Sequence, residues 1–252
     1  MRFVTISDVH IKEPGDTAEE LFLSFLKSPE VNNSEGIYLL GDIFDLVVGG
    51  HLDYRYKFKR VFDALVEHAN AGKMIYQFEG NHDFHFQNII KVINKEELDH
   101  SRWFYINRPF VLENMGKRIL LAHGDELELD NLSYKIYRLF IRSRLIYNLA
   151  NLYYDFNFVE SIGKYLSKKS RKRNTKNYGQ SFNQDKIKGK FRKSAVSALE
   201  KFNCEFYICG HSHCKDEWLK EDFSYYNNGY FPREKSFIYY NGDTFEFVEI
   251  KA

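Results

Sequence analysis

Short apolar runs that end at polar or glycine-containing motifs recur along most of the chain. Their composition, rich in Val, Ile, Leu, Phe and Tyr, is typical of buried strands. The five clearest runs are Phe3–Ile6, Ile37–Leu40, Lys73–Phe78, Arg118–Ala122 and Glu205–Cys209. Segments with helical periodicity, Ala18–Leu26 and Tyr56–Ala69, separate the first three runs. This alternation of strand and helix predicts an α/β fold.

The C-terminal part of the chain has a different pattern, in which strands follow one another without helices between them. A hairpin turn is predicted at Asn241-Gly242-Asp243, and the expected antiparallel strands are Lys215–Leu219, Phe223–Asn227, Ser236–Tyr240 and Thr244–Ile250. Two further short strands are expected around Pro109. We therefore predict a four-layer α/β/β/α sandwich, in which two mixed sheets pack face to face and helices lie outside, with a helical insert.

The predicted insert lies between the fourth and fifth apolar runs. A basic stripe of Lys135, Arg138 and Arg142 adjoins apolar positions at helical spacing, which are Leu132, Ile136, Leu139, Phe140 and Tyr147. An aromatic cluster follows, made of Tyr153, Tyr154, Phe156, Phe158 and Val159. We predict a single domain over residues 1–252, with residues 128–195 as a helical, basic insert. This insert is either a lid with an apolar underside or a cap packed on the core.

Charge is unevenly placed along the chain. The formal net charge is only +1, yet the segment from Lys164 to Lys193 holds twelve Lys and Arg residues and a single acid, Asp185. Such a run suits phosphates, a polynucleotide backbone or an anionic membrane surface, and it also occurs as a merely solvated face.

Composition and the chain's first residues narrow the class of protein. The 252 residues, of which 44% are hydrophobic, suffice for one large core. The three cysteines lack CxxC spacing, which argues against a disulfide framework or a zinc knuckle. No apolar stretch approaches the roughly 20 residues that span a bilayer. The first residues have the pattern of a strand rather than of a secretion signal, so we expect a protein without one. We expect a cytoplasmic protein. If the basic insert binds lipid, the protein would attach as a peripheral protein to the inner face of the cytoplasmic membrane.

Five short motifs carry the chemistry, and most follow directly on a predicted strand. They are Asp8-Val9-His10, Gly41-Asp42-Ile43-Phe44-Asp45, Gly80-Asn81-His82-Asp83, His123-Gly124-Asp125 and Gly210-His211-Ser212-His213. Each motif alone is weak, but all five in order, spaced for successive strands, predict a two-metal site at the edge of a sheet. Such a site activates water and binds a phosphorus centre.

The residue types suggest how two ions would be held. A bridging ligand must serve both ions, and the carboxylate of Asp42 is our candidate. Asp8 and His10 can converge on one ion, whereas His211 and His213 are expected to divide between the two. Asn81 offers a neutral oxygen, and His123 completes the set. The mixture of Asp, Asn and His favours Mn²⁺, with Fe²⁺ or Zn²⁺ as alternatives, over Mg²⁺ or Ca²⁺.

His82 is the predicted general acid, because it lies beside Asn81, where it could protonate a leaving oxygen. Asp45, three residues after Asp42, is predicted to hold the other ring nitrogen of His82 and fix its tautomer.

The five motifs resemble the pattern of the calcineurin-like metallophosphoesterase superfamily, and they span residues 8 to 213. The resemblance implies one ion held by Asp8, His10, Asp42 and His213, and a second held by Asp42, Asn81, His123 and His211. It also implies in-line attack of metal-activated water on phosphorus, with His82 on the leaving side.

Within that superfamily the chain looks most like the UDP-2,3-diacylglucosamine hydrolase family of lipid A synthesis and its close relatives. The residues that carry this likeness are Tyr38-Leu39-Leu40 before Gly41-Asp42, Gly80 to Phe84, His123 to Glu126, Ser197 to Lys201, and Tyr225 to Gly229. The likeness implies cleavage of a diphosphate to UMP and an acyl-glucosamine 1-phosphate. The best-known members carry Arg where this chain has His82, and a His suits alkoxide leaving groups as well.

The predicted substrate contacts are Asn81, Asp125, Lys186 and Lys190, with the apolar, basic insert beside an acylated anion. A phosphoesterase for nucleotides or nucleic acid is the alternative, since a basic strip with tyrosines also suits a polynucleotide. A scaffold that kept the fold and lost catalysis is the third hypothesis.

Overall fold

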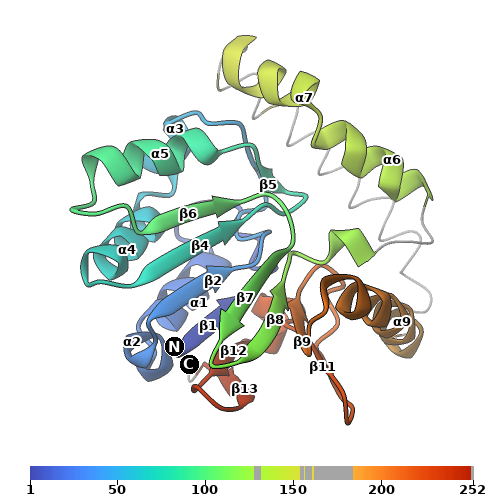
Figure 1. The fold of residues 1–252 in the computed structure, drawn as a ribbon. Coiled ribbons are helices and arrows are strands. Elements are labelled where there is room, and N and C mark those ends of the chain that lie inside the picture. Colours follow the sequence, from blue (N-terminus) through green and yellow to red (C-terminus); the bar gives the residue numbers. More distant parts are fainter. Residues whose placement is uncertain (128–131, 154–155, 157–160, 162–183, 251–252) are drawn as a thin grey trace.

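Two β-sheets lie face to face at the centre of the molecule (Figure 1). The computed structural model describes residues 1–127, 132–153, 156, 161 and 184–250. The six-stranded sheet contains β1 (Phe3–Ile6), β2 (Gly36–Leu39), β4 (Met74–Phe78), β6 (Trp103–Ile106), β12 (Ser236–Tyr240) and β13 (Phe245–Glu249). Its order is β13-β12-β1-β2-β4-β6. Strands β1, β2, β4 and β6 run parallel, whereas β12 is antiparallel to both of its neighbours.

The five-stranded sheet contains β7 (Phe110–Asn114), β8 (Lys117–Leu121), β9 (Phe206–Cys209), β10 (Asp216–Leu219) and β11 (Ser224–Asn227). Its order is β10-β11-β9-β8-β7, with β8, β9 and β11 parallel and the two edge strands antiparallel. A small third sheet pairs β3 (Val47–Val48) with β5 (Asp83–Phe84). Both main sheets are therefore mixed, as the sequence predicts.

The alternation of side chains along each strand builds three apolar layers. In β1, Phe3 points between the two sheets, whereas Val4 points to the outer side, where α1 (Thr17–Leu26), α4 (Lys59–Asn70) and α5 (Gln87–Glu96) pack. In β8, Leu120 faces the opposite outer side, which α9 (Gln184–Phe202) covers through Phe191 and Leu199. The predicted four-layer α/β/β/α sandwich is confirmed.

The predicted helix over Tyr56–Ala69 is broken in the structure. A short helix, α3 (Asp53–Lys57), ends at Phe58, where the backbone leaves the helical region (φ −98°, ψ 38°), and α4 begins at the next residue. The Phe58 ring is buried against Phe44, with ring centroids 4.6 Å apart. The break between the two helices thus coincides with a buried aromatic contact. Helices α2 (Pro29–Asn33) and α5 are additions that the sequence analysis did not predict.

The C-terminal strands form the predicted antiparallel pairs, but the pairs belong to different sheets. Strands β10 and β11 extend the five-stranded sheet, where β11 also pairs parallel with β9, and β12 and β13 extend the other sheet. The chain crosses between the sheets through residues 228–235, which include α10 (Phe231–Glu234). We call residues 228–235 the crossover segment.

The region after His123 begins with a 3-10 turn, η1 (Asp125–Leu127). It continues as α6 (Leu132–Ile141), α7 (Arg144–Asn148) and the π-helical turn η2 (Leu149–Tyr153). Helices α6 and α7 form an arm at one end of the molecule (Figure 1). The apolar positions predicted for the underside of a lid are instead exposed on α6, by 70% at Leu132, 60% at Ile136, 72% at Leu139 and 56% at Phe140. Tyr154, Phe158, Val159 and the basic residues up to 183 lie outside the described residues.

The predicted boundary of the insert at residue 195 falls inside α9, whose second half packs on the five-stranded sheet. A separate insert over residues 128–195 stays a prediction. In the described part of the chain, none of the helices combines the length and the apolar character that crossing a bilayer requires.

Candidate metal centre

The five motifs meet at one edge of the two sheets. Strands β1, β2 and β4 are parallel neighbours, so the loops that follow them emerge side by side. The backbones of these loops are joined, with Asp8 N donating to Gly41 O at 3.2 Å and His10 N donating to Asp42 O at 3.0 Å. In the other sheet Gly210 N donates to His123 O at 2.8 Å, which joins the loops after β8 and β9.

Most of the predicted ligands lie on left-handed backbone, which non-glycine residues rarely adopt. The φ angles are 53° at Asp8, 54° at His10, 54° at Asp42, 66° at His211 and 55° at His213. Each such residue costs on the order of 1 kcal/mol or more, and strained residues of this kind gather at functional sites. These turns let Asp8 and His10 converge, whereas they direct His211 and His213 to different partners, Asn81 and Asp8.

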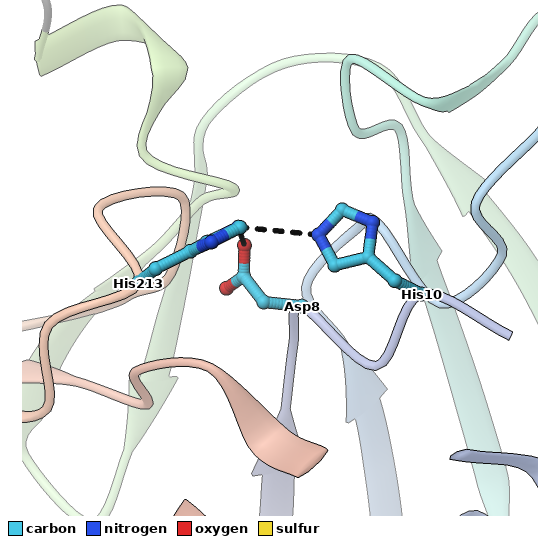
Figure 2. Close-up of side chains that lie close together, drawn as sticks. All are labelled: Asp8, His10 and His213. Atoms are coloured by element: carbon cyan, nitrogen blue, oxygen red, sulfur yellow. Dashed lines mark hydrogen bonds and ion pairs between the residues drawn. The ribbon is translucent and has the colours of Figure 1, made fainter. Parts of the chain in front are cut away.

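The first group of side chains joins Asp8, His10 and His213 from both sheets (Figure 2). His213 Nε2 lies 3.3 Å from Asp8 Oδ1 and 3.1 Å from His10 Nε2. His10 Nε2 is also 3.7 Å from Asp42 Oδ2. These are the four residues that the resemblance assigns to one ion.

The second group is centred on Asn81. Its Oδ1 lies 3.1 Å from His123 Nε2 and 3.0 Å from His211 Nδ1. His123 Nε2 is 3.6 Å from Asp42 Oδ2, the same oxygen that faces His10. Asp42 therefore lies between the two groups, in the place that a bridging carboxylate requires.

The two groups fit divalent cations. Asp8 and Asp42 are both buried, and two buried carboxylates so close together need positive charge beside them. Burial, together with the charges of His82 and His213, lowers the pKa of His10 to about 3 in spite of Asp42. Burial also opposes a charge on His123, but Asp42 and Asp8 raise its pKa to about 9. The two carboxylates therefore favour positive charge at His123, the kind of charge that a metal ion would supply.

Backbone carbonyls orient two of the histidines. His123 Nδ1 lies 2.8 Å from Leu40 O, an arrangement that leaves Nε2 as the ligand atom. His82 Nδ1 lies 2.9 Å from Asp45 O, so the carbonyl of Asp45 fixes the His82 tautomer. The Asp45 carboxylate lies beside both His10 and His82, with Oδ1 3.7 Å from His10 Nδ1, and its predicted role toward His82 stays a prediction.

Asp83 supports the loop after β2, which carries Asp42. The sequence analysis did not predict this role, although Asp83 belongs to the Gly80-Asn81-His82-Asp83 motif. Its buried carboxylate accepts hydrogen bonds from Asp42 N at 2.8 Å, Ile43 N at 2.7 Å and Gly80 N at 3.0 Å. Gly80 is required here, because a Cβ at this position would overlap the Asp42 carboxylate. The fixed backbone places Asp42 with little freedom to move.

Asp125, a predicted substrate contact, is engaged by Arg138 of α6 and by Arg142, which directly follows this helix. Its buried carboxylate lies 2.8 Å from Arg138 Nε and 3.1 Å from Arg142 Nη2. Asp125 thus attaches α6 to the loop that carries His123, and its contact with a sugar stays a prediction.

Lys186 and Lys190, the predicted phosphate contacts, lie on the first two turns of α9. The ring of Phe191, next to Lys190, is 6.2 Å from that of His211, so this end of α9 adjoins the second group. Direct contact of either lysine with a phosphate stays a prediction.

Two tyrosines beside the histidines were also missed. The ring of Tyr134 on α6 is 5.3 Å from that of His211, and Tyr230 in the crossover segment stacks on His213 with centroids 5.1 Å apart. The helical spacing of α6 could have indicated Tyr134, whereas only the fold places Tyr230 here.

The ion pairs of Asp125 predict a stability that depends on pH. Although burial opposes it, the charges of Arg142, His123 and Arg138 hold the pKa of Asp125 below its usual range. The folded pKa lies below the unfolded value of about 3.9, so the stabilisation is complete above that pH and is lost as pH falls through the folded pKa. We expect Asp125→Asn to lower the free energy of unfolding of the metal-free protein by about 2–3 kcal/mol at pH 7, since both arginines keep some water access.

Urea unfolding of wild type and Asp125→Asn at pH 7 and pH 3 measures this difference. The gap between the two proteins should narrow at pH 3. An equal gap at both pH values would show that the ion pairs do not account for the stability.

Comparison with known proteins agrees with this geometry. Residues 1–215 match the calcineurin-like phosphoesterase family. A UDP-2,3-diacylglucosamine hydrolase of Proteus mirabilis is 30% identical over 82% of this chain and 80% of its own length. The Yersinia pestis protein of the same name is 28% identical over 84% of this chain and 82% of its own length.

Among solved structures, a predicted phosphoesterase of Streptococcus pneumoniae aligns over 99% of this chain and 92% of its own, with 13% identity and a TM-score of 0.44. The family match covers all five motifs. The chain belongs to the calcineurin-like phosphoesterase family, whose members are metal-dependent phosphoester hydrolases with two divalent ions.

Proposed function

We propose that the protein hydrolyses the diphosphate of a nucleotide-linked acylated sugar, UDP-2,3-diacylglucosamine, to UMP and acyl-glucosamine 1-phosphate in lipid A biosynthesis. The names of the two relatives support the nucleotide sugar. The main support for an acylated substrate is an exposed apolar surface on the helical arm. The arm itself lies beside the second group of ligands, through Tyr134 and His211. We call the exposed surface the apolar face, and it comprises Leu132, Ile136, Leu139, Phe140 and Leu145.

The two sides of α6 differ in what they contact. One side of α6 turns toward the site. On this side Tyr134 contacts the His211 ring, Arg138 binds the Asp125 carboxylate, and Ile141 is buried. The apolar face turns away from the site, and its five side chains are between 56% and 72% exposed. Lys135 and Arg144 are exposed on the same arm. An apolar surface with flanking cations suits a helix that lies on an anionic membrane, where acylated substrates reside.

The residues of the site suit the proposed reaction. Asp8, His10, Asp42 and His213 would hold one ion, and Asp42, Asn81, His123 and His211 the other, with Mn²⁺ favoured by this donor set. When bound, the two ions would supply water activation and charge neutralisation at phosphorus.

In this proposal His82 moves a proton at the leaving oxygen. Because Asp45 O accepts the hydrogen bond from Nδ1, the Nε2 atom of His82 is the one available to a substrate. Its ring lies 4.9 Å from the His10 ring, edge to face, so the proposed acid adjoins the first ion.

The test compares hydrolysis of UDP-2,3-diacylglucosamine, presented in anionic vesicles with Mn²⁺, with that of a plain nucleotide diester. We expect kcat/KM to be higher for the lipid-linked diphosphate. The double variant Ile136→Asp with Leu139→Asp should lower kcat/KM for the acylated substrate by about tenfold or more, because it removes two apolar contacts. Hydrolysis of a soluble bis-aryl phosphate should not change.

Tyr56→Asp on α3 is the matched control, since Tyr56 is 71% exposed. A preference for the plain diester would assign the site to nucleotides or nucleic acid instead. An unchanged kcat/KM for the acylated substrate in the double variant would remove the role of the apolar face.

A further inference from the structure

The crossover segment passes along the first group of ligands. Phe231 N donates a hydrogen bond to Asp8 O at 3.2 Å. Arg233 Nη2 donates to His213 O at 2.5 Å. Upstream, Asn228 N donates to Cys209 O at 2.9 Å and so fixes the start of the segment to β9. Both loops of the first group are therefore held by one segment, which lies beyond the residues that match the family.

Tyr230 connects this segment to the ligand rings themselves. Its ring stacks on that of His213, with an interplanar angle of 25°, and lies 5.9 Å from the ring of His10. The offset contact of two flat rings restricts rotation of the imidazole.

His213 needs such support more than the other ligands do. Its side chain is 41% exposed, whereas those of His10 and His123 are 6% and 1% exposed. His123 is also anchored by Leu40 O. Within the described residues no carbonyl contact of that kind holds the His213 ring. Besides the Asp8 and His10 contacts of its Nε2, the ring is supported by Tyr230, and the backbone carbonyl of His213 is held by Arg233.

We propose that Tyr230 and Arg233 are positioning residues for the first ion. They hold His213 in place as a ligand and so set the affinity for the ion bound by Asp8, His10 and His213, while the second ion is held independently of them. This inference rests on the ligand sets of the proposed function.

The test is a Mn²⁺ titration of the metal-free protein by calorimetry, with the electron paramagnetic resonance spectrum as a second readout. Wild type should bind two ions with a spin-coupled spectrum. Tyr230→Ala should weaken one of the two ions by about tenfold to a hundredfold, the usual effect of losing support around a ligand, and should leave the other unchanged. Tyr230→Phe keeps the ring and should retain both ions.

Variants of the ligands assign the affected ion. His123→Ala should lose the second ion, so adding Tyr230→Ala should then weaken the ion that remains. In His213→Ala, adding Tyr230→Ala should have no further effect. Tyr56→Ala is the matched control, because that tyrosine is exposed on α3. Arg233→Ala, whose side chain is 45% exposed, tests the same claim if Tyr230→Ala does not fold.

Wild-type affinities for both ions in Tyr230→Ala and Arg233→Ala would overturn the proposal, as would an equal loss of both ions. A failure of wild type to bind two ions would overturn the ligand sets instead. No substrate enters this experiment, so its result is independent of whether the protein cleaves a lipid-linked diphosphate.

Discussion

Asp42→Asn is expected to reduce kcat/KM by at least about a thousandfold. The two oxygens of Asp42 have different tasks. Oδ1 accepts a hydrogen bond from the backbone N–H of His82 at 2.9 Å, and Oδ2 faces both His10 and His123. The amide can keep the first contact but removes the bridging charge. Loss of a shared ligand removes several kcal/mol of transition-state stabilisation, and about 1.4 kcal/mol corresponds to a factor of ten.

Steady-state hydrolysis of a bis-aryl phosphate with Mn²⁺ measures this loss without reference to the natural substrate. Asp53→Asn is the matched control, because Asp53 is an exposed carboxylate at the start of α3. If Asp42→Asn retained wild-type turnover, Asp42 would not be the bridging ligand.

The second large effect is expected at His82, and it should depend on the leaving group. His82→Ala should lower kcat by about 10²–10⁴-fold for esters with a poor, alkoxide leaving group, because a positioned acid contributes that much. The loss should be much smaller for an aryl leaving group, which departs without protonation. The hydrogen bond between Nδ1 and Asp45 O predicts that Nε2 carries the proton to the substrate.

A series of phosphodiesters with leaving groups of rising pKa gives this measurement, with His100→Ala, an exposed histidine, as control. Equal slowing of good and poor leaving groups would mean that His82 is not the acid.

The fold and the ligand strands were predictable because they follow local rules. A buried strand shows its apolar run directly, and β1 (Phe3–Ile6) has the predicted bounds. Parallel strands must end at a common edge, so the motifs that follow β1, β2 and β4 were expected to meet. The structure brings these loops together with the His123 and His211 loops of the second sheet.

The features that could not be predicted depend on contacts between segments distant in sequence. The helix break at Phe58 comes from its packing on Phe44, which no local pattern contains. Asp125 binds arginines 13 and 17 residues further along, in the last turn of α6 and directly after it, and only the fold sets the direction of this helix. Tyr230 reaches His213 because the chain changes sheets beside the site.

The outward position of the apolar face has a similar origin. Leu132, Ile136 and Leu139 have the spacing of a helix side, but the spacing does not say what that side contacts. The ion pairs of Asp125 turn the opposite side of α6 toward the ligands. The orientation of α6 is thus decided by charged groups rather than by its apolar stripe.

A crystal of the protein soaked in Mn²⁺ and measured at the manganese absorption edge tests the central claim most directly. We expect two anomalous peaks about 3.5–4 Å apart, with Asp42 between them. The remaining ligands should divide into Asp8, His10 and His213 around one peak and Asn81, His123 and His211 around the other. A single peak, or peaks remote from Asp42, would contradict a two-metal site at this edge of the sheets.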